Sequence, residues 1–267
     1  MEDTTRKVPI IMIENSNGSI VYVIGTCHVS EDSRRAVKKL IRTVRPDFVI
    51  LELCEGRDAI LYQDEGSLRE SLSQEGLGWF TLDPVKNMKK LYVILANKFG
   101  ILPGGEMKTA YDEAKKIPGT KVLLGDLPME LTEHKVQHEY SFWDKLKFAC
   151  AILVLSCLSV FTTKEQMMNL VLTKSSDNES LSESGSLLLD GRDEFLTFSL
   201  QRAAETWIFD EKEELISPPT VVGVVGEAHI PGIERNWSLI TEDDIHQLLE
   251  SYNCDVTNFD INKERVV

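Results

Sequence analysis

Two apolar runs in this sequence end in a glycine with a histidine three positions after it. A histidine in such a place could bind a metal or transfer a proton. The first is VYVIGTCH, ending at His28, and the second is VVGVVGEAH, ending at His229. A third run, FVILEL, contains Glu52, whose carboxylate is costly to bury unless it is paired or bound to a metal. Two histidines and a carboxylate commonly hold a divalent metal and leave positions open for water or substrate. These three residues are the predicted ligands of one divalent ion, with manganese, cobalt and zinc left open.

Other residues near these runs could complete such a site. Glu55 and Glu227 are candidates for a general base or for a group that orients a histidine. Gly25 and Gly226 lack a Cβ and would let a substrate approach the backbone. Asp126 ends a fourth apolar run, KVLLGD, and would lie beside the others, where it could contact a substrate, if the strands are parallel neighbours.

Each candidate also has a structural interpretation. A single histidine at the end of a strand is more often structural than a ligand, so His28 carries little weight alone. Glu52 could pair with nearby Arg57, and Asp126 could cap the turn that follows it. Cys27 precedes His28, but neighbours on a strand point to opposite faces, which argues against a Cys-His dyad.

Hydrophobic periodicity predicts the strands and helices that would position these residues. VPIIMI and IVYVIG, separated by ENSNG, predict a hairpin. Ser30 can cap a helix with an apolar stripe, and FVILEL then predicts a strand buried on both faces.

We expect an α/β fold with a mixed, largely parallel central sheet flanked by helices. It would form one domain over residues 8–262, with a mainly helical insertion at about 67–216, interrupted by a strand near 121–126. KSSDNESLSESGS predicts a mobile, acidic, serine-rich loop at 174–190.

Composition narrows the classes of partner. A net charge of −14 argues against a nucleic-acid surface. Five scattered cysteines without C-x-x-C spacing favour a reducing compartment. The first residues do not resemble a secretory signal, which predicts an intracellular protein.

Phe148 to Phe161 is the most apolar stretch; we expect a core helix, with peripheral membrane contact as the alternative. His134 and His138 share a helix face, but HKVQH lacks the glutamate of an H-E-x-x-H site, so we expect surface placement.

The sequence resembles the TraB family over about residues 20 to 237. The similarity is carried by two G-x-x-H words with the glutamate of LEL between them. It extends through VIGTCHVSEDS, PDFVILELCEGR, VLLGDLPMELT, SFWDKLKFA, RDEFLTFSLQRAAE and VVGVVGEAHIPGIERNW.

This resemblance implies a function. Within the wider group, TIKI proteins are regarded as metal-dependent proteases acting on Wnt ligands, and bacterial relatives limit peptide pheromone activity. It implies a peptidase-like hydrolase, acting on a peptide or protein, whose metal would lie on His28, Glu52 and His229. Arg57 and Arg192 match the family words ELCxxR and ERD and could hold a substrate carboxylate or a developing oxyanion. For each arginine, an ordinary ion pair is the alternative. The animal relatives imply peripheral association with the mitochondrial outer membrane.

Several positions depart from the family pattern. Leu127 replaces an arginine in GDRP, another expected arginine is missing near His134, and Gly191 replaces the glutamate of ERD. The metal ligands are kept while the surrounding charges are not, so substrate preference or activity could differ. A non-catalytic intracellular adaptor or organelle-surface protein is therefore an alternative function, and a small-molecule esterase similar to erythromycin esterases is another.

Overall fold

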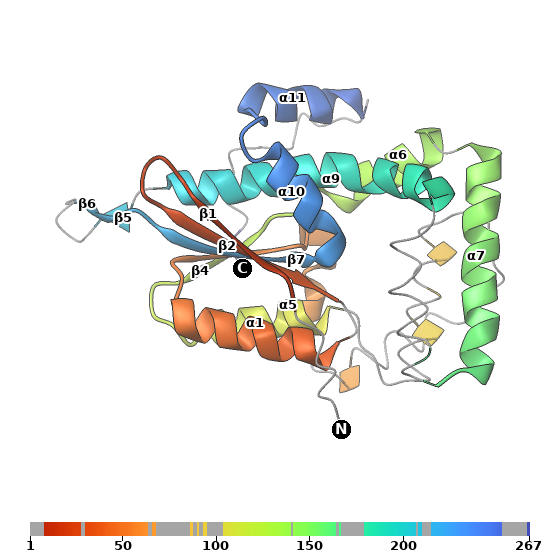
Figure 1. The fold of residues 1–267 in the computed structure, drawn as a ribbon, viewed down its shortest axis with the longest axis horizontal. Helices are drawn as coiled ribbons and strands as arrows, with labels where there is room; N and C mark the ends of the chain where they lie inside the picture. Colours follow the sequence, from red (N-terminus) through yellow and green to blue (C-terminus); the bar gives the residue numbers. More distant parts are fainter. Residues whose placement is uncertain are drawn as a thin grey trace. The chain divides into compact units, whose positions relative to one another are not determined.

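The structure is a computed structural model of the chain (Figure 1). The described residues are 8–27, 30–63, 104–139, 141–163, 179–206 and 215–252, with 66–67, 86–87, 90, 93–94, 166, 208–209 and 266–267. They fall into two compact units, one of residues 1–62, 104–129 and 189–267 and one of residues 63–103 and 130–188. Residues 104–129 and 189–216, which we assigned to the insertion, therefore cluster with the first unit.

A five-stranded sheet forms the centre of the first unit, in the order β1-β2-β7-β3-β4. Strands β1 (Ile10–Glu14) and β2 (Ile20–Thr26) form the predicted antiparallel hairpin. Its turn includes Gly18 at φ 85°, a conformation that glycine adopts without a steric penalty. Strands β7 (Thr220–Gly226), β3 (Phe48–Leu51) and β4 (Lys121–Leu124) continue in parallel from β2. The predicted mixed, largely parallel α/β fold is confirmed.

Helices cover both faces of this sheet. Helix α1 (Glu31–Val44) begins at Ser30, whose hydroxyl accepts from the backbone of Asp32 at 3.2 Å, as predicted. Its buried Val37 and Ile41 pack with helix α5 (Gly105–Ala114) on one face. On the other face lie the C-terminal half of α9 (Glu179–Glu205) and helix α10 (Ile230–Asn236). A Cβ on Gly223 of β7 would come within 2.7 Å of Leu200, so glycine lets α9 lie close to the sheet.

The remaining elements are short or lie outside the sheet. Two 3-10 turns, Glu55–Arg57 and Glu227–His229, follow β3 and β7. Helix α11 (Glu242–Ser251) is capped at Thr241. Further elements are α2 (Ala59–Tyr62), β5 (Ile208–Phe209), β6 (Leu215–Ser217), α6 (Met129–Glu139) and α7 (Phe142–Phe161).

The serine-rich segment differs from the prediction. Helix α9 already begins at Glu179, so residues 179–190 are helical where we expected a loop. Serine and glutamate are polar without preventing helix formation, and composition could not distinguish a polar helix from a polar loop. Residues 174–178 of the predicted loop lie outside the described residues.

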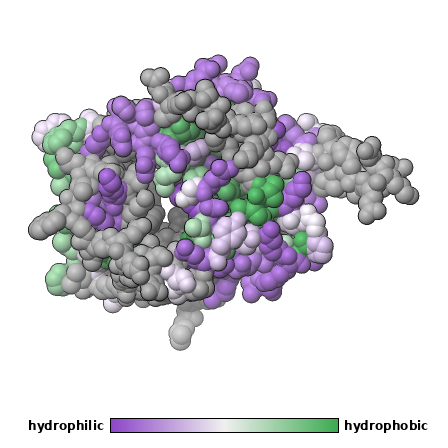
Figure 2. Space-filling view, turned by 180° about the vertical axis from the view of Figure 1, so that it is seen from behind, coloured by the Kyte–Doolittle hydropathy of each residue, from purple (hydrophilic) through white to green (hydrophobic). Residues whose placement is uncertain are grey.

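Helix α7 contains the apolar stretch that we expected in a core. Within Phe148 to Phe161, Ile152 is buried, but Leu153, Val154 and Phe161 are 44%, 49% and 86% exposed, so the stretch is only partly covered. Hydrophobic, green atoms on α7 are visible in Figure 2. In the parts of the chain that the structure describes, no helix combines the length and apolar character needed to cross a membrane.

Candidate functional site

Three parallel strands bring candidate residues to one edge of the sheet. Glu52 directly follows β3, Asp126 is the second residue after β4, and His229 ends the 3-10 turn after β7. Backbone bonds extend the strand pairing up to these residues, because Glu52 donates to Val224 at 3.1 Å and Asp126 donates to Leu53 at 3.1 Å. The carboxyl ends of parallel strands meet at one edge, which is where such folds bind ligands.

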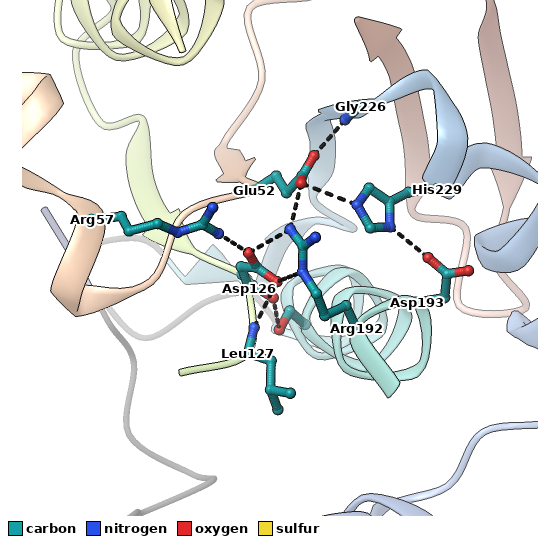
Figure 3. Close-up of polar contacts among 10 residues, drawn as sticks. Glu52, Arg57, Asp126, Leu127, Arg192, Asp193, Gly226 and His229 are labelled. Atoms are coloured by element: carbon teal, nitrogen blue, oxygen red, sulfur yellow. Dashed lines mark hydrogen bonds and ion pairs between the residues drawn. The ribbon is translucent and has the colours of Figure 1, made fainter. Parts of the chain in front are cut away.

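Glu52 and His229 face each other at this edge (Figure 3). The Nε2 of His229 lies 3.0 Å from Oε1 of Glu52, and the other carboxylate oxygen accepts from the backbone of Gly226 at 2.5 Å. On the far side of the ring, Nδ1 of His229 lies 2.5 Å from Oδ1 of Asp193. The imidazole is therefore held between two carboxylates, one from β3 and one from α9.

Two arginines extend this group to a third carboxylate, Asp126. The guanidinium of Arg192 donates to Asp126 from Nε at 3.0 Å and from Nη2 at 2.8 Å, and Nη2 also lies 2.5 Å from Glu52. Arg57 donates to Oδ2 of Asp126, the oxygen that also accepts from Nη2 of Arg192. Asp126 also accepts from the backbone of Leu127 at 2.8 Å. We call these six side chains the edge network; they are Glu52, Arg57, Asp126, Arg192, Asp193 and His229.

Burial makes the charges of the edge network interact strongly. The side chains of Glu52 and His229 are 5% and 3% exposed, and that of Arg192 is 18% exposed. Burial alone would lower the pKa of His229, but the charge of Glu52 and the hydrogen bonds to Asp193 and Glu52 outweigh it and raise this pKa to about 9. With the ring protonated, three cations face three carboxylates.

Desolvation lowers the pKa of each arginine, but the opposing charge of Asp126 more than offsets it. The pKa of Arg192 and the pKa of Arg57 are therefore raised, so both guanidinium groups stay charged. Among the contacts of Asp126, the Arg192 fork fixes orientation as well as charge, because both guanidinium nitrogens meet one carboxylate.

A nitrogen and a carboxylate oxygen that face each other are chemically suited to a divalent ion. Nε2 of His229 and Oε1 of Glu52 are such a pair, with Asp193 holding the other ring nitrogen as carboxylates do behind metal-bound histidines. Among the described residues, no group of three His, Cys, Asp or Glu side chains is arranged to hold a metal. The third predicted ligand, His28, lies outside the described residues.

Sequence comparison gives a family match that spans most of the chain. The model of the TraB/PrgY/gumN family matches residues 9–246, which includes the whole edge network. The chain belongs to this family.

Relatives of this TraB chain come from animals and an archaeon. It is 35% identical to a mouse TraB domain-containing protein over 241 residues, which cover 83% of this chain and 64% of the mouse protein. The human protein of the same name is 34% identical over the same shares. An uncharacterized protein of Methanocaldococcus jannaschii is 28% identical over 229 residues, covering 80% of this chain and 52% of that protein. The chain thus spans less than two thirds of each relative's length.

The structure brings together some of the predicted site residues of this TraB chain. Glu52, Asp126 and His229 lie in one network with both predicted arginines. Asp126 accepts from the backbone of Leu127, as a turn-capping residue does, and it also binds both arginines. It therefore has the structural contacts that we considered as the alternative; its contact with a substrate stays a prediction.

The other predicted residues have different surroundings. Glu55 is exposed and Glu227 is half-buried, each at the start of a 3-10 turn, and their roles as bases stay predictions. A Cβ on Gly25 would meet Ile230 at 2.8 Å and Pro9 at 3.0 Å, so close packing also explains this glycine. Gly226 contributes its backbone N–H to Glu52.

Sequence reasoning missed Asp193. It stands next to Arg192 in the quoted word RDEFLTFSLQRAAE, and only its neighbour was selected. Consecutive residues on a helix point about 100° apart, so either one could have faced the sheet, and the sequence did not show that both reach the network. The available signal for Asp193 was its place in a helical segment, just before Phe195 and Leu196, which are buried.

Two of the three departures from the family pattern adjoin residues of the edge network along the chain, and the third lies on α6. Leu127 is 2% exposed, so an apolar side chain fills the buried position where the resemblance implied an arginine. Gly191 is buried directly before Arg192, and His134 is half-buried on α6, where its ring lies 4.2 Å from that of His138. Neither histidine is buried, and His138 is the more exposed of the two.

Proposed function

We propose that this TraB-family protein is a metal-dependent hydrolase acting on a peptide or related acyl bond. The observation that carries the proposal is the convergence of His229 Nε2 and Glu52 Oε1 at 3.0 Å, with Asp193 behind the imidazole. Glu52 and His229 would hold the metal, and His28 is the proposed third ligand. A divalent metal in such a site lowers the pKa of bound water and polarises a carbonyl.

The chain's own residues would perform the remaining tasks. Arg57 is the more accessible arginine, with a side chain 34% exposed and one carboxylate partner in Asp126. It is the better candidate to bind a substrate carboxylate or an oxyanion, because a guanidinium offers several donors. Arg192 has contacts to both Glu52 and Asp126, which suit it to hold these carboxylates in place. Glu55 and Glu227 are the proposed bases.

The metal can be tested directly. Purified protein should bind manganese, cobalt or zinc on titration, and His229→Ala and Glu52→Gln should each weaken this binding strongly. Exposed His246, which lies 3.9 Å from Glu242 on α11, supplies the matched control His246→Ala, which should bind like wild type. A wild-type protein that binds none of the three metals would contradict the proposal.

Hydrolysis can then be tested with metal-loaded protein. Peptide and ester libraries separate a peptidase from a small-molecule esterase, and the His229→Ala variant shows whether any hydrolysis belongs to this site. We expect peptide cleavage by wild type and its loss in the variant. Metal binding without hydrolysis of either library would argue against catalysis while leaving the metal site in place.

An adaptor or organelle-surface protein is the second candidate function. It is favoured by the exposed apolar residues of α7, including Trp143 and Phe161, which could contact a membrane surface or another protein. The contact of Arg192 with Glu52 at 2.5 Å also gives this carboxylate a structural role without a metal. An intracellular position at the mitochondrial surface is part of this proposal.

A vesicle assay tests the membrane part of the second candidate. The double variant Trp143→Ser/Phe161→Ser should lose flotation with liposomes of mitochondrial lipid composition, while the wild type floats. Rescue of a null mutant by His229→Ala as well as by wild type would favour the adaptor over the hydrolase.

A further inference from the structure

Asp193 lies on the side of the His229 ring opposite Glu52 (Figure 3). We propose that Asp193 is a positioning residue that presents Nε2 of His229 to the metal, and that Gly232 lets helix α10 pack directly on the Asp193 carboxylate. This inference rests on the proposed metal site, because it concerns the orientation of one of its ligands. It adds two residues, one on α9 and one on α10, that were not among the candidates from the sequence.

The two nitrogens of the His229 ring differ in how well their carboxylate partners can accept a hydrogen bond. Nδ1 lies 2.5 Å from Asp193, whereas Nε2 lies 3.0 Å from Glu52. Oε1 of Glu52 also accepts from Arg192 at 2.5 Å, so it already has a strong donor. A metal binds the neutral imidazole, so Nε2 must give up its proton, and the one remaining N–H is better placed on Nδ1, donating to Asp193. The lone pair is then on Nε2, which is the nitrogen that faces Glu52.

Gly232 shows that this carboxylate has a fixed place. A Cβ on Gly232 would lie 1.8 Å from Oδ2 and 2.3 Å from Cγ of Asp193. These distances are far shorter than any real contact, so a side chain at position 232 would displace the carboxylate or the helix. The Asp193 side chain is therefore confined between the imidazole and the backbone of α10, and His229 and Gly232 are only three residues apart.

Helix α9 does not depend on Asp193 alone for its position. Leu196, Leu200 and Ala203 pack with Val221 and Val225 of β7 in one buried cluster. The hydroxyl of Ser199 donates to the backbone of Gly125 at 3.0 Å. Asp193→Asn keeps the shape of the side chain and these contacts, so this variant should fold and allow the orienting role to be measured.

The experiment compares metal affinity with folding stability in matched variants. Zinc and cobalt(II) affinity and urea unfolding are measured for Asp193→Asn and Gly232→Ala. The controls are Asp112→Asn, at a side chain of α5 that is 48% exposed, and Gly56→Ala, where a Cβ would meet no atom within 4 Å. We expect the first two variants to lose about 10- to 100-fold in affinity, as is typical when the partner of a metal-bound histidine is removed. Both controls should bind like wild type.

A double variant separates orientation from general damage. Asp193→Asn and Gly232→Ala act on one contact, so together they should lose no more affinity than the stronger single variant. Losses that multiply would show that Gly232 acts separately from Asp193. Variants that unfold in less urea but bind metal like wild type would overturn the positioning role and leave the metal site intact.

A measurement on metal-free protein keeps the inference testable if no metal binds. Nitrogen-15 NMR of the His229 ring, recorded at a pH where the imidazole is neutral, reports which nitrogen carries the hydrogen. We expect the Nδ1–H form in wild type and a mixture in Asp193→Asn. The Nε2–H form in wild type would overturn the inference, whereas absence of metal binding with the Nδ1–H form would count against the proposed function alone.

Discussion

Two buried carboxylates in this protein differ in how exposed their cationic partners are. Glu113 on α5 is bound by Arg42 at 2.6 Å and by Lys116 at 2.8 Å, with Lys38 at 3.8 Å, and these three side chains are 47–60% exposed. Glu52, in contrast, is bound by Arg192 and His229, whose side chains are only 18% and 3% exposed. Both carboxylates are 5% exposed, so the difference lies in their partners.

This difference separates a stabilising ion cluster from a candidate site. Surface cations reach Glu113 with their charged ends still hydrated, so little is lost by desolvation. In the edge network both signs of charge are removed from water, which is costly and is not an efficient way to gain stability. Buried, strongly coupled titratable groups at the end of parallel strands are characteristic of functional sites.

Removal of Arg192 should have the largest effect on stability. Arg192→Met takes one cation from Glu52 and Asp126 together, and we expect the free energy of unfolding to fall by about 3 to 5 kcal/mol. Urea unfolding measures this loss. Arg192→Lys is the control for charge without the guanidinium fork and should lose less. A change below about 1 kcal/mol for Arg192→Met would mean that the edge network is more hydrated than its burial indicates.

Arg57→Met should have a smaller effect in the same network. Arg57 is partly exposed and binds Asp126, which keeps its two bonds from Arg192. A loss of about 1.5 to 3 kcal/mol in urea unfolding is expected for one charged hydrogen bond. If Arg57→Met proved as destabilising as Arg192→Met, the division between an accessible and a structural arginine would be wrong.

The Glu113 cluster should respond to acid in a defined range. The hydrogen bond from Arg42, opposed by burial and aided by Lys116, lowers the pKa of Glu113 to about 2. A lowered pKa stabilises the fold above the unfolded-state pKa, and this contribution is lost as the pH falls from about 5 to about 2.

Glu113→Gln should therefore lose about 1 to 2 kcal/mol at neutral pH, an amount limited by the solvent around its partners. The stability difference from wild type should shrink across that acidic range, as measured by urea unfolding at several pH values. A difference that stays constant with pH would show that Glu113 contributes through packing and not through its charge.

Lys38→Ala should have the smallest effect. Lys38 is the most distant of the three cations, at 3.8 Å from Glu113, and its side chain is half-exposed. We expect a change below about 0.5 kcal/mol, and about the same in high salt, because exposed pairs contribute little. Thermal unfolding at low and high ionic strength provides the measurement. A loss as large as that of Glu113→Gln would contradict the description of this cluster as a solvated one.

Local patterns in the sequence were sufficient for the elements around the sheet. The hairpin, the Ser30 cap and the buried strands were predicted because turn residues, caps and hydrophobic runs act within a few positions. The polar segment at 179–190 was predicted wrongly, since polarity alone does not decide between a helix and a loop. The exposed residues of α7 could not be predicted either, because exposure depends on what packs against a helix.

The sequence by itself determined which residue types follow each strand, including Glu52, Asp126 and His229. Their convergence required the strand order, which places β7 between β2 and β3 although it comes last among the sheet's strands. Only the tertiary structure decided that Asp193, from a helix packed across the sheet, reaches the far side of His229. Contacts between residues distant in sequence depend on how whole elements pack, and short-range patterns do not contain that information.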